Sequence, residues 1–224
     1  MEPISPPTIG RFLLPACLLV LSLLVWHCAL AADELLCPFE TTDGLSLTWG
    51  QNLKGHLDLS TNKTYVTEGT QALRLWGEVS PEAKGNSYLG VRIDLAEPVD
   101  LRRKLILLDA ATSTPEVTRA MYLRAYDDKG RRALSYVNWN SPLGSTPRTF
   151  QFVPGLGGGG FTWEPKEITP DADRTRVVAF ELLIGTPDPG VTMDAFFDNL
   201  RVQETDMKAW QDVTSPKPLV RETS

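Results

Sequence analysis

The sequence contains few cysteines and histidines, the residues on which disulfides and zinc sites depend. Its 224 residues include three cysteines and two histidines. Cys17, His27 and Cys28 lie near the start, in or beside a long apolar run, which leaves Cys37 and His56 for the rest of the chain. One cysteine allows no internal disulfide, and one histidine and one cysteine are too few for a zinc site.

Clusters of basic residues are also missing. Lys and Arg number 22 against 28 Asp and Glu, which gives a net charge of -6. A protein that binds nucleic acid would carry a basic patch, so this function class is excluded. The chain has no G-x-S-x-G motif for a serine nucleophile, and its Gly-rich stretch at 155–160 lacks the Lys of a phosphate loop. Paired carboxylates that cleave a glycosidic bond remain a less favoured enzymatic alternative.

The first 31 residues have the organisation of a secretory signal peptide. Arg11 precedes an apolar run from Phe12 to about Trp26, and an A-x-A sequence ends at Ala31. This pattern predicts cleavage after Ala31 and a secreted or extracytoplasmic protein, in the periplasm or at the cell surface. The alternative is an uncleaved N-terminal anchor, since the stretch up to Ala32 is just long enough to span a bilayer. Only in that case would a membrane be a partner.

From Glu34 onward the chain alternates apolar and polar residues in short segments, without a long helical pattern. In "SYLGVRIDL", Leu89, Val91 and Ile93 fall on one face, with Tyr88 and Arg92 on the other. Such alternation is typical of half-buried strands, and the 17 prolines and 17 glycines separate the strands as in a sandwich. We therefore predict an all-β antiparallel β-sandwich over residues 34–203, followed by a flexible tail at 204–224.

The segment 120–139 predicts a β-hairpin. Met121, Leu123 and Ala125 would face a core, and the turn "DDKG" ends in a glycine that tolerates positive φ. The returning strand would run through Ser135 and Val137 to Trp139.

The order of several motifs resembles a known family. "CPFETTDGLSLTW", "VTEGTQALRL", "YLGVRIDL", the "YLRAYDDKGRR" hairpin, "DRTRVVAFELLIG" and "AFFDNLRV" follow one another along the chain. This order is similar to that of galactose-binding-like β-sandwiches, especially the secreted jelly-roll carbohydrate-binding modules. The resemblance extends from Leu36 to Gln203 and implies the same jelly-roll fold.

The resemblance also implies a structural Ca²⁺ ion. In those modules the Glu of a Phe-Glu pair, a loop segment and the Asp of the last strand hold the ion, and Glu40, Glu68 and Asp198 match these positions. Two hard carboxylates and loop carbonyls provide the oxygen ligands that Ca²⁺ prefers. The alternative is that Asp198, which interrupts an apolar strand, caps backbone N–H groups at the strand end.

The resemblance further implies a glycan or polysaccharide as the ligand. Carbohydrate modules stack sugar rings on exposed aromatic side chains, while Arg, Asn, Gln and Asp bind the hydroxyl groups. The candidate residues that could line a groove on one sheet are Tyr88, Arg92, Tyr122, Arg124, Tyr126 and either Tyr136 or Trp139, depending on the hairpin register. The alternative is that these aromatic residues only pack in or around the sandwich.

The function predicted from the sequence is therefore non-catalytic carbohydrate binding outside the cytoplasm. An extracytoplasmic protein-interaction or assembly module on the same fold is the main alternative, because a fold does not determine a function. The sequence "NKT" at Asn62 is an N-glycosylation motif, which has meaning only in a host that glycosylates secreted proteins.

Overall fold

The described part of the chain is built from β-strands. A computed structural model describes residues 33–157 and 160–205. The strands are β1 (Glu34–Cys37), β2 (Leu45–Gln51), β3 (Leu53–Ser60), β4 (Ala72–Val79), β5 (Ser87–Val99), β6 (Lys104–Thr112), β7 (Ala120–Asp127), β8 (Arg132–Asn138), β9 (Arg148–Phe152), β10 (Thr162–Trp163), β11 (Val177–Thr186) and β12 (Thr192–Glu204). One short 3₁₀ helix, η2 (Pro165–Glu167), precedes β11. No helix within these residues is long and apolar enough to cross a membrane.

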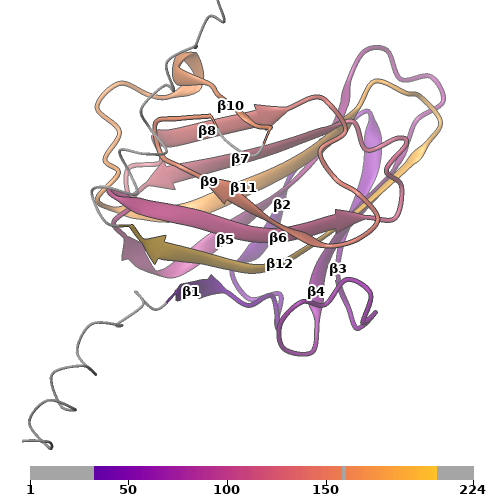
Figure 1. Ribbon diagram of the computed structural model, residues 1–224. Helices are drawn as coiled ribbons and strands as arrows, with labels where there is room; N and C mark the ends of the chain where they lie inside the picture. The colour runs from indigo at the N-terminus through magenta and orange to yellow at the C-terminus, as the bar shows by residue number, and fades with distance from the viewer. Residues whose placement is uncertain (1–32, 158–159, 206–224) are drawn as a thin grey trace, which may run out of the picture. The chain divides into compact units, whose positions relative to one another are not determined.

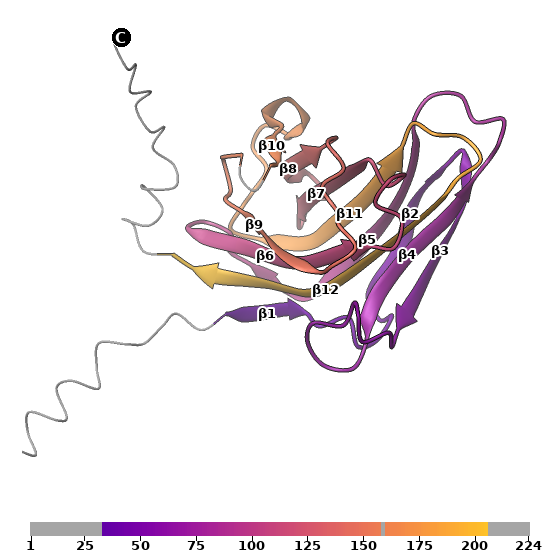
Figure 2. The same ribbon diagram turned by 45° about the vertical axis from the view of Figure 1, so that its right-hand side comes forward.

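Two antiparallel sheets pack face to face (Figure 1). The first, here called the β12 sheet, has the order β3-β4-β12-β6-β9, and β1 pairs with the C-terminal part of β12. The second, the β11 sheet, has the order β10-β8-β7-β11-β5-β2. Figure 2 shows the two layers from another side, with β3 and β4 at the edge of the β12 sheet. The predicted antiparallel β-sandwich is therefore confirmed.

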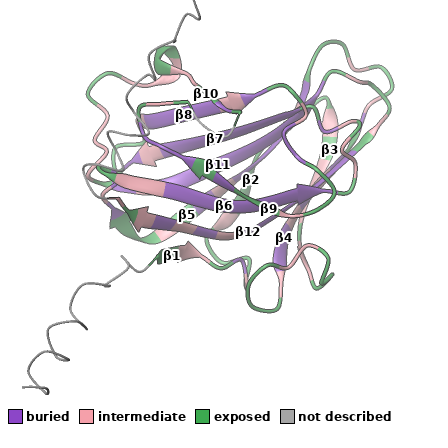
Figure 3. Cartoon of the chain, viewed as in Figure 1, coloured by how far each residue is buried: buried purple, intermediate pink, exposed green. Residues whose placement is uncertain are grey.

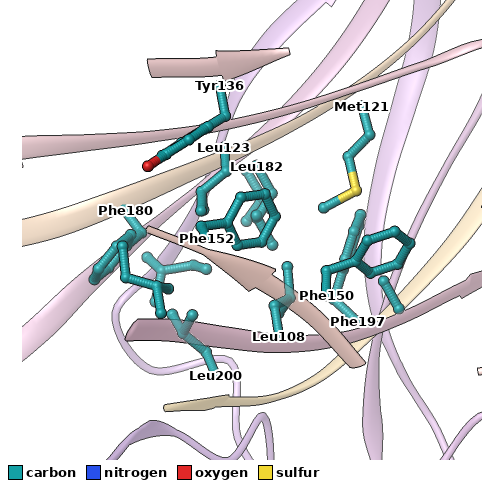
Figure 4. Close-up of a cluster of buried hydrophobic side chains, with 14 of the residues drawn as sticks. Leu108, Met121, Leu123, Tyr136, Phe150, Phe152, Phe180, Leu182, Phe197 and Leu200 are labelled. Atoms are coloured by element: carbon teal, nitrogen blue, oxygen red, sulfur yellow. The ribbon is translucent and has the colours of Figure 1, made fainter. Parts of the chain in front are cut away.

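The core lies between the sheets and is formed by the alternate residues that the sequence pattern predicted. Leu89, Val91 and Ile93 of β5 are at most 1% exposed. Strands β6, β7, β8 and β11 are coloured as mostly buried in Figure 3. Their apolar surface drives the packing of the sheets, at about 25 cal/mol for each Å² removed from water. Met121 and Leu123 of β7 project into the same core, beside Phe150 and Phe197 of the opposite sheet (Figure 4).

Tyr136 belongs to this core, so its placement on a ligand-binding face is wrong. Tyr136 lies opposite Leu123 in the β7–β8 register and is completely buried. Its ring packs against Phe152 at a centroid distance of 5.2 Å, and its hydroxyl donates a hydrogen bond to the carbonyl of Val153. The register explains this burial, because residues directly opposite each other on antiparallel strands point to the same face of the sheet, and Leu123 points to the core.

The β7–β8 hairpin has the predicted turn. Gly130 has a φ of 72°, and its N–H donates to the carbonyl of Asp127 at 2.9 Å. The glycine is required because this left-handed conformation strains other residues. The hairpin places the outward side chains of β7 beside those of β8 and β11, where the candidate site is found.

The strands run from Glu34 to Glu204, which leaves two predictions about the ends of the chain open. The predicted signal peptide or anchor at 1–31 and all but the first residues of the tail at 204–224 lie outside the described residues.

Candidate functional site

The outer face of the β11 sheet carries two neighbouring rows of side chains that cross the strands. The first row, called the aromatic row after Trp49 and Tyr122, joins positions that are paired in register across five strands: Trp49, Gly90, Leu183, Tyr122 and Val137. The charged row lies next to it and joins Ser46, Arg92, Glu181, Arg124 and Ser135. Since neighbouring strands are about 4.8 Å apart, the aromatic row spans about 14 Å between Trp49 and Tyr122.

A hollow of about 300 Å³ lies along these rows and is here called the groove. Its lining consists of Trp49, Gln51, Tyr88, Tyr122, Arg124, Glu167 and Leu183. Trp49, which lines it, is 41% exposed, and Trp139, which contacts the lining residues Tyr88 and Tyr122, is 36% exposed. Exposed large aromatic side chains on both sides of a hollow are typical of a binding surface rather than of a solvated sheet face.

One wall of the groove is a cluster of three aromatic rings. Tyr88, Tyr122 and Trp139 contact one another edge to face, with ring centroids 5.9–6.2 Å apart. Trp139 Nε1 donates a hydrogen bond to the Tyr122 hydroxyl at 2.9 Å. Burial raises the pKa of Tyr122, so the hydroxyl stays neutral. The contacts hold Tyr122 in place, while Trp139 keeps 36% of its surface exposed.

The opposite wall is Trp49, which the sequence reading missed. Strict alternation from Leu45 would turn Trp49 toward the core, but a β-bulge between Leu47 and Trp49 reverses it onto the outer face. Gly90 lies beneath the indole, and a Cβ there would be 2.9 Å from Trp49 Cδ1. The bulge and the glycine together let the indole approach the backbone of β5 closely.

Glu181 lies under the groove and connects its parts. It is 5% exposed, although its side chain points to the outer face of the sheet. Glu181 Oε1 accepts a hydrogen bond from Trp49 Nε1 at 3.1 Å, and Oε2 accepts one from the Tyr126 hydroxyl at 2.8 Å. Arg124 Nη1 is 3.5 Å from Glu181 Oε2. These partners compensate the cost of burying the carboxylate.

Arg124 is also bound by Glu167 of η2. Arg124 Nη2 is 3.0 Å and Arg132 Nη1 is 3.1 Å from Glu167 Oε2, which also accepts a hydrogen bond from Ser135 Oγ at 2.8 Å. Burial disfavours the charged form of Glu167, but the Ser135 hydrogen bond and the two arginines outweigh it, and the pKa of Glu167 lies below its usual value. Glu167 therefore stays ionised, which is the opposite of what a general acid requires.

The other candidates from the sequence lie near the groove without lining it. Arg92 Nε is 2.7 Å from Asp94 Oδ1, and its guanidinium lies 5.6 Å from the centre of the Tyr126 ring. Burial raises the pKa of Tyr126, and the neighbouring Glu181 carboxylate acts in the same direction. The structure thus gathers Arg92, Tyr122, Arg124, Tyr126 and Trp139 on one face.

Glu40, one residue proposed for calcium, lies in a hydrogen-bonded setting at the loop before β4. Glu40 Oε1 accepts hydrogen bonds from the N–H groups of Thr70 and Gln71 at 2.7 and 3.2 Å, and Oε2 accepts one from Thr70 Oγ1 at 2.5 Å. The Thr70 hydrogen bonds are the main cause of a lowered pKa of Glu40.

Asp198 has a similar set of donors. Its Oδ2 accepts the N–H groups of Thr67 and Glu68 at 2.7 and 3.0 Å, and its Oδ1 accepts the N–H of Asn199 at 2.8 Å. Burial raises the pKa of Asp198. The side chain of Glu68 is exposed.

The contacts of Asp198 fit the alternative interpretation, in which this carboxylate caps backbone N–H groups at the strand end, and Glu40 accepts N–H groups in a similar way. Within residues 33–157 and 160–205, no three His, Cys, Asp or Glu side chains gather closely enough to hold a metal ion. The oxygens of Glu40 and Asp198 accept backbone N–H groups together with the hydroxyl groups of Thr70 and Thr67. Calcium binding at Glu40, Glu68 and Asp198 stays a prediction.

The sequence matches no protein-family model and no curated protein. Solved structures give matches in fold. The family 11 carbohydrate-binding module of a cellulosomal cellulase of Clostridium thermocellum has a TM-score of 0.54 at 12% identity, over 78% of this chain and 96% of the module. A structure described as a family 11 module from the same organism in complex with a β-1,3-1,4-mixed-linked tetrasaccharide has a TM-score of 0.52 at 12% identity, over 77% and 96%.

An exo-β-agarase shows the same likeness over only part of its length. Its TM-score is 0.52 at 14% identity, and the match covers 77% of this chain but 26% of the agarase. At identities this low the likeness concerns the fold alone. The chain has the jelly-roll β-sandwich fold that these carbohydrate-binding modules share.

Proposed function

We propose that this protein binds a glycan or polysaccharide in the groove on the β11 sheet and does not cleave it. The observation that carries the proposal is the pair of exposed tryptophans, Trp49 and Trp139, on either side of a hollow lined by hydrogen-bonding side chains. Aromatic faces suit the apolar faces of sugar rings, and Arg and Glu suit their hydroxyl groups. The fold shared with carbohydrate-binding modules supports this function.

The chemistry of the groove supports binding without catalysis. Glycoside hydrolysis needs one carboxyl group that is protonated at working pH. Glu167 has a lowered pKa, and Glu167 and Glu181 both contact Arg124. Neither carboxylate is arranged to deliver a proton to a leaving group.

We further propose that the protein is exported. The support is the signal-peptide pattern of residues 1–31. A protein-interaction or assembly module is the second candidate function, since the same exposed tryptophans could anchor a protein partner.

The test is a screen of the purified protein against neutral and acidic polysaccharides, with Trp49→Ala and Trp139→Ala beside the native protein. We expect each substitution to weaken binding more than tenfold, which corresponds to about 1.4 kcal/mol. Trp76→Ala is the matched control, because Trp76 is a partly exposed tryptophan of β4, in the other sheet. Unchanged binding in both groove variants, or no response from a folded sample, would overturn the proposal, and the latter result would favour a protein partner.

A further inference from the structure

We infer that the groove selects uncharged glycans over acidic ones, and that Glu167 is the residue that sets this preference. The inference rests on the proposed function, because it names the class of glycan that the same groove accepts. It follows from how the charges around the groove are paired, and from one carboxylate oxygen of Glu167 that accepts no hydrogen bond from the described residues.

The cation in the groove is already neutralised. Among the described residues that line it, Arg124 is the positive one and Glu167 the negative one. Arg124 lies between two carboxylates, with Nη2 3.0 Å from Glu167 and Nη1 3.5 Å from Glu181. Its side chain is only 10% exposed, so a sugar carboxylate or sulfate would have to displace one of these partners to form an ion pair.

Two neighbouring arginines on this face are paired as well. Arg132 contacts Glu167 at 3.1 Å, and Arg92 contacts Asp94 at 2.7 Å. An anionic ligand binds tightly where it meets a free guanidinium or ammonium group that can replace its lost water. At this groove the described arginines have their carboxylate partners within the protein.

Glu167 contributes an acceptor that suits a hydroxyl group and repels an anion. The hydrogen bonds that its side chain receives from Arg124, Arg132 and Ser135 all go to Oε2. Its Oε1 accepts none from the described residues, while the side chain is 35% exposed and lines the groove. An ionised oxygen of this kind accepts a hydrogen bond from a sugar hydroxyl, whereas a like charge placed against it is strongly disfavoured.

The experiment compares matched pairs of glycans that differ in charge. One pair is a mixed-linked β-glucan and the same glucan oxidised to uronic acids at C6, and the other is agarose oligosaccharides and sulfated galactan oligosaccharides. Affinities are measured by calorimetry at low and at physiological salt for the native protein, Glu167→Gln and Glu164→Gln. Glu164→Gln is the matched control, because it removes the same charge three residues away without being part of the groove lining.

We expect the native protein to bind the neutral member of a pair at least about tenfold more tightly at low salt, with a smaller ratio at higher salt. Glu167→Gln should reduce this ratio several-fold, because it removes the repelling charge, leaves Arg132 without its carboxylate partner and leaves Arg124 with Glu181 alone. Glu164→Gln should keep the native ratio. Equal or tighter native binding of the acidic member would overturn the inference while leaving the proposed function intact. An equal effect of the two substitutions would also overturn it, since net charge alone would then explain the preference. If no glycan of either kind binds, the proposed function fails, and this inference fails with it.

Discussion

Asp127 shows how a single buried charge is held in this fold. The residue ends β7 and is completely buried. Its Oδ1 accepts the N–H groups of Lys129 and Arg131 at 3.0 and 2.8 Å. Its Oδ2 accepts the Arg131 guanidinium at 2.7 Å and the N–H of Asp173 at 2.9 Å. Burial opposes ionisation, but these bonds prevail, and the pKa of Asp127 lies far below its ordinary value.

Replacing Asp127 should therefore destabilise the protein. Asp127→Ala removes the acceptor shared by the hairpin turn and the segment around Asp173, and we expect a loss of about 2–3 kcal/mol in the free energy of unfolding. Urea denaturation measures it, provided that the slope of the transition is unchanged. Asp128→Ala is the control, because Asp128 forms an exposed ion pair with Arg176 and should change stability by less than about 1 kcal/mol. Equal losses in both variants would contradict this account of the turn.

At the scale of strands and hairpins, the sequence predicted the buried faces of the strands in which apolar and polar residues alternate. β5 and β7 bury the residues that alternation assigned to the core, and the 127–130 turn closes the hairpin. Trp49 was missed because the bulge in β2 breaks the alternation, and a bulge leaves no reliable mark in a single sequence. The choice between Tyr136 and Trp139 stayed open because it depends on the register of the β7–β8 hairpin, which the sequence does not specify.

The buried charge in β11 left a signal that the sequence reading did not use. Glu181 lies within the apolar run "VVAFELLIG", just as Asp198 lies within "AFFDNL". A carboxylate in such a run must find partners, so Glu181 could have been named as a candidate for the same reason as Asp198. Its partners Trp49 and Arg124 come from β2 and β7, and only the three-dimensional pairing brings them together.

The loop between β3 and β4 gives a prediction about calcium. Glu40 and Asp198 accept hydrogen bonds from N–H groups within residues 67–71, so both carboxylates already have partners within the protein. We expect the same melting temperature in EDTA and in millimolar calcium, measured by scanning calorimetry. Asp198→Ala, in contrast, should lower the melting temperature in both buffers. A rise with calcium that disappears in Asp198→Ala would instead establish the metal site suggested by the family resemblance.

The stability of the whole sandwich should depend on pH through its carboxylates. Asp127 and Glu167 have pKa values below their ordinary values of 3.8 and 4.5, so the unfolded chain binds more protons than the folded protein in this range. Their contribution is complete above the ordinary values and is lost as the pH falls toward the lowered ones. Asp198 has the opposite sign, because its pKa is raised above 3.8 and its contribution decreases as the pH rises.

The loss of stability in acid should dominate, because more carboxylates have a lowered pKa than a raised one. The carboxylates with a lowered pKa include Glu40, Glu82, Asp100, Asp127, Glu167 and Asp173. We expect the urea midpoint to fall steadily between about pH 5 and pH 3, where protonation removes these interactions. In Asp127→Asn the fall should be shallower, since the most strongly shifted carboxyl group can no longer titrate. A midpoint that stays constant over this range, or rises as acid is added, would mean that Asp198 outweighs the hydrogen-bonded and ion-paired carboxylates of the turns and the groove.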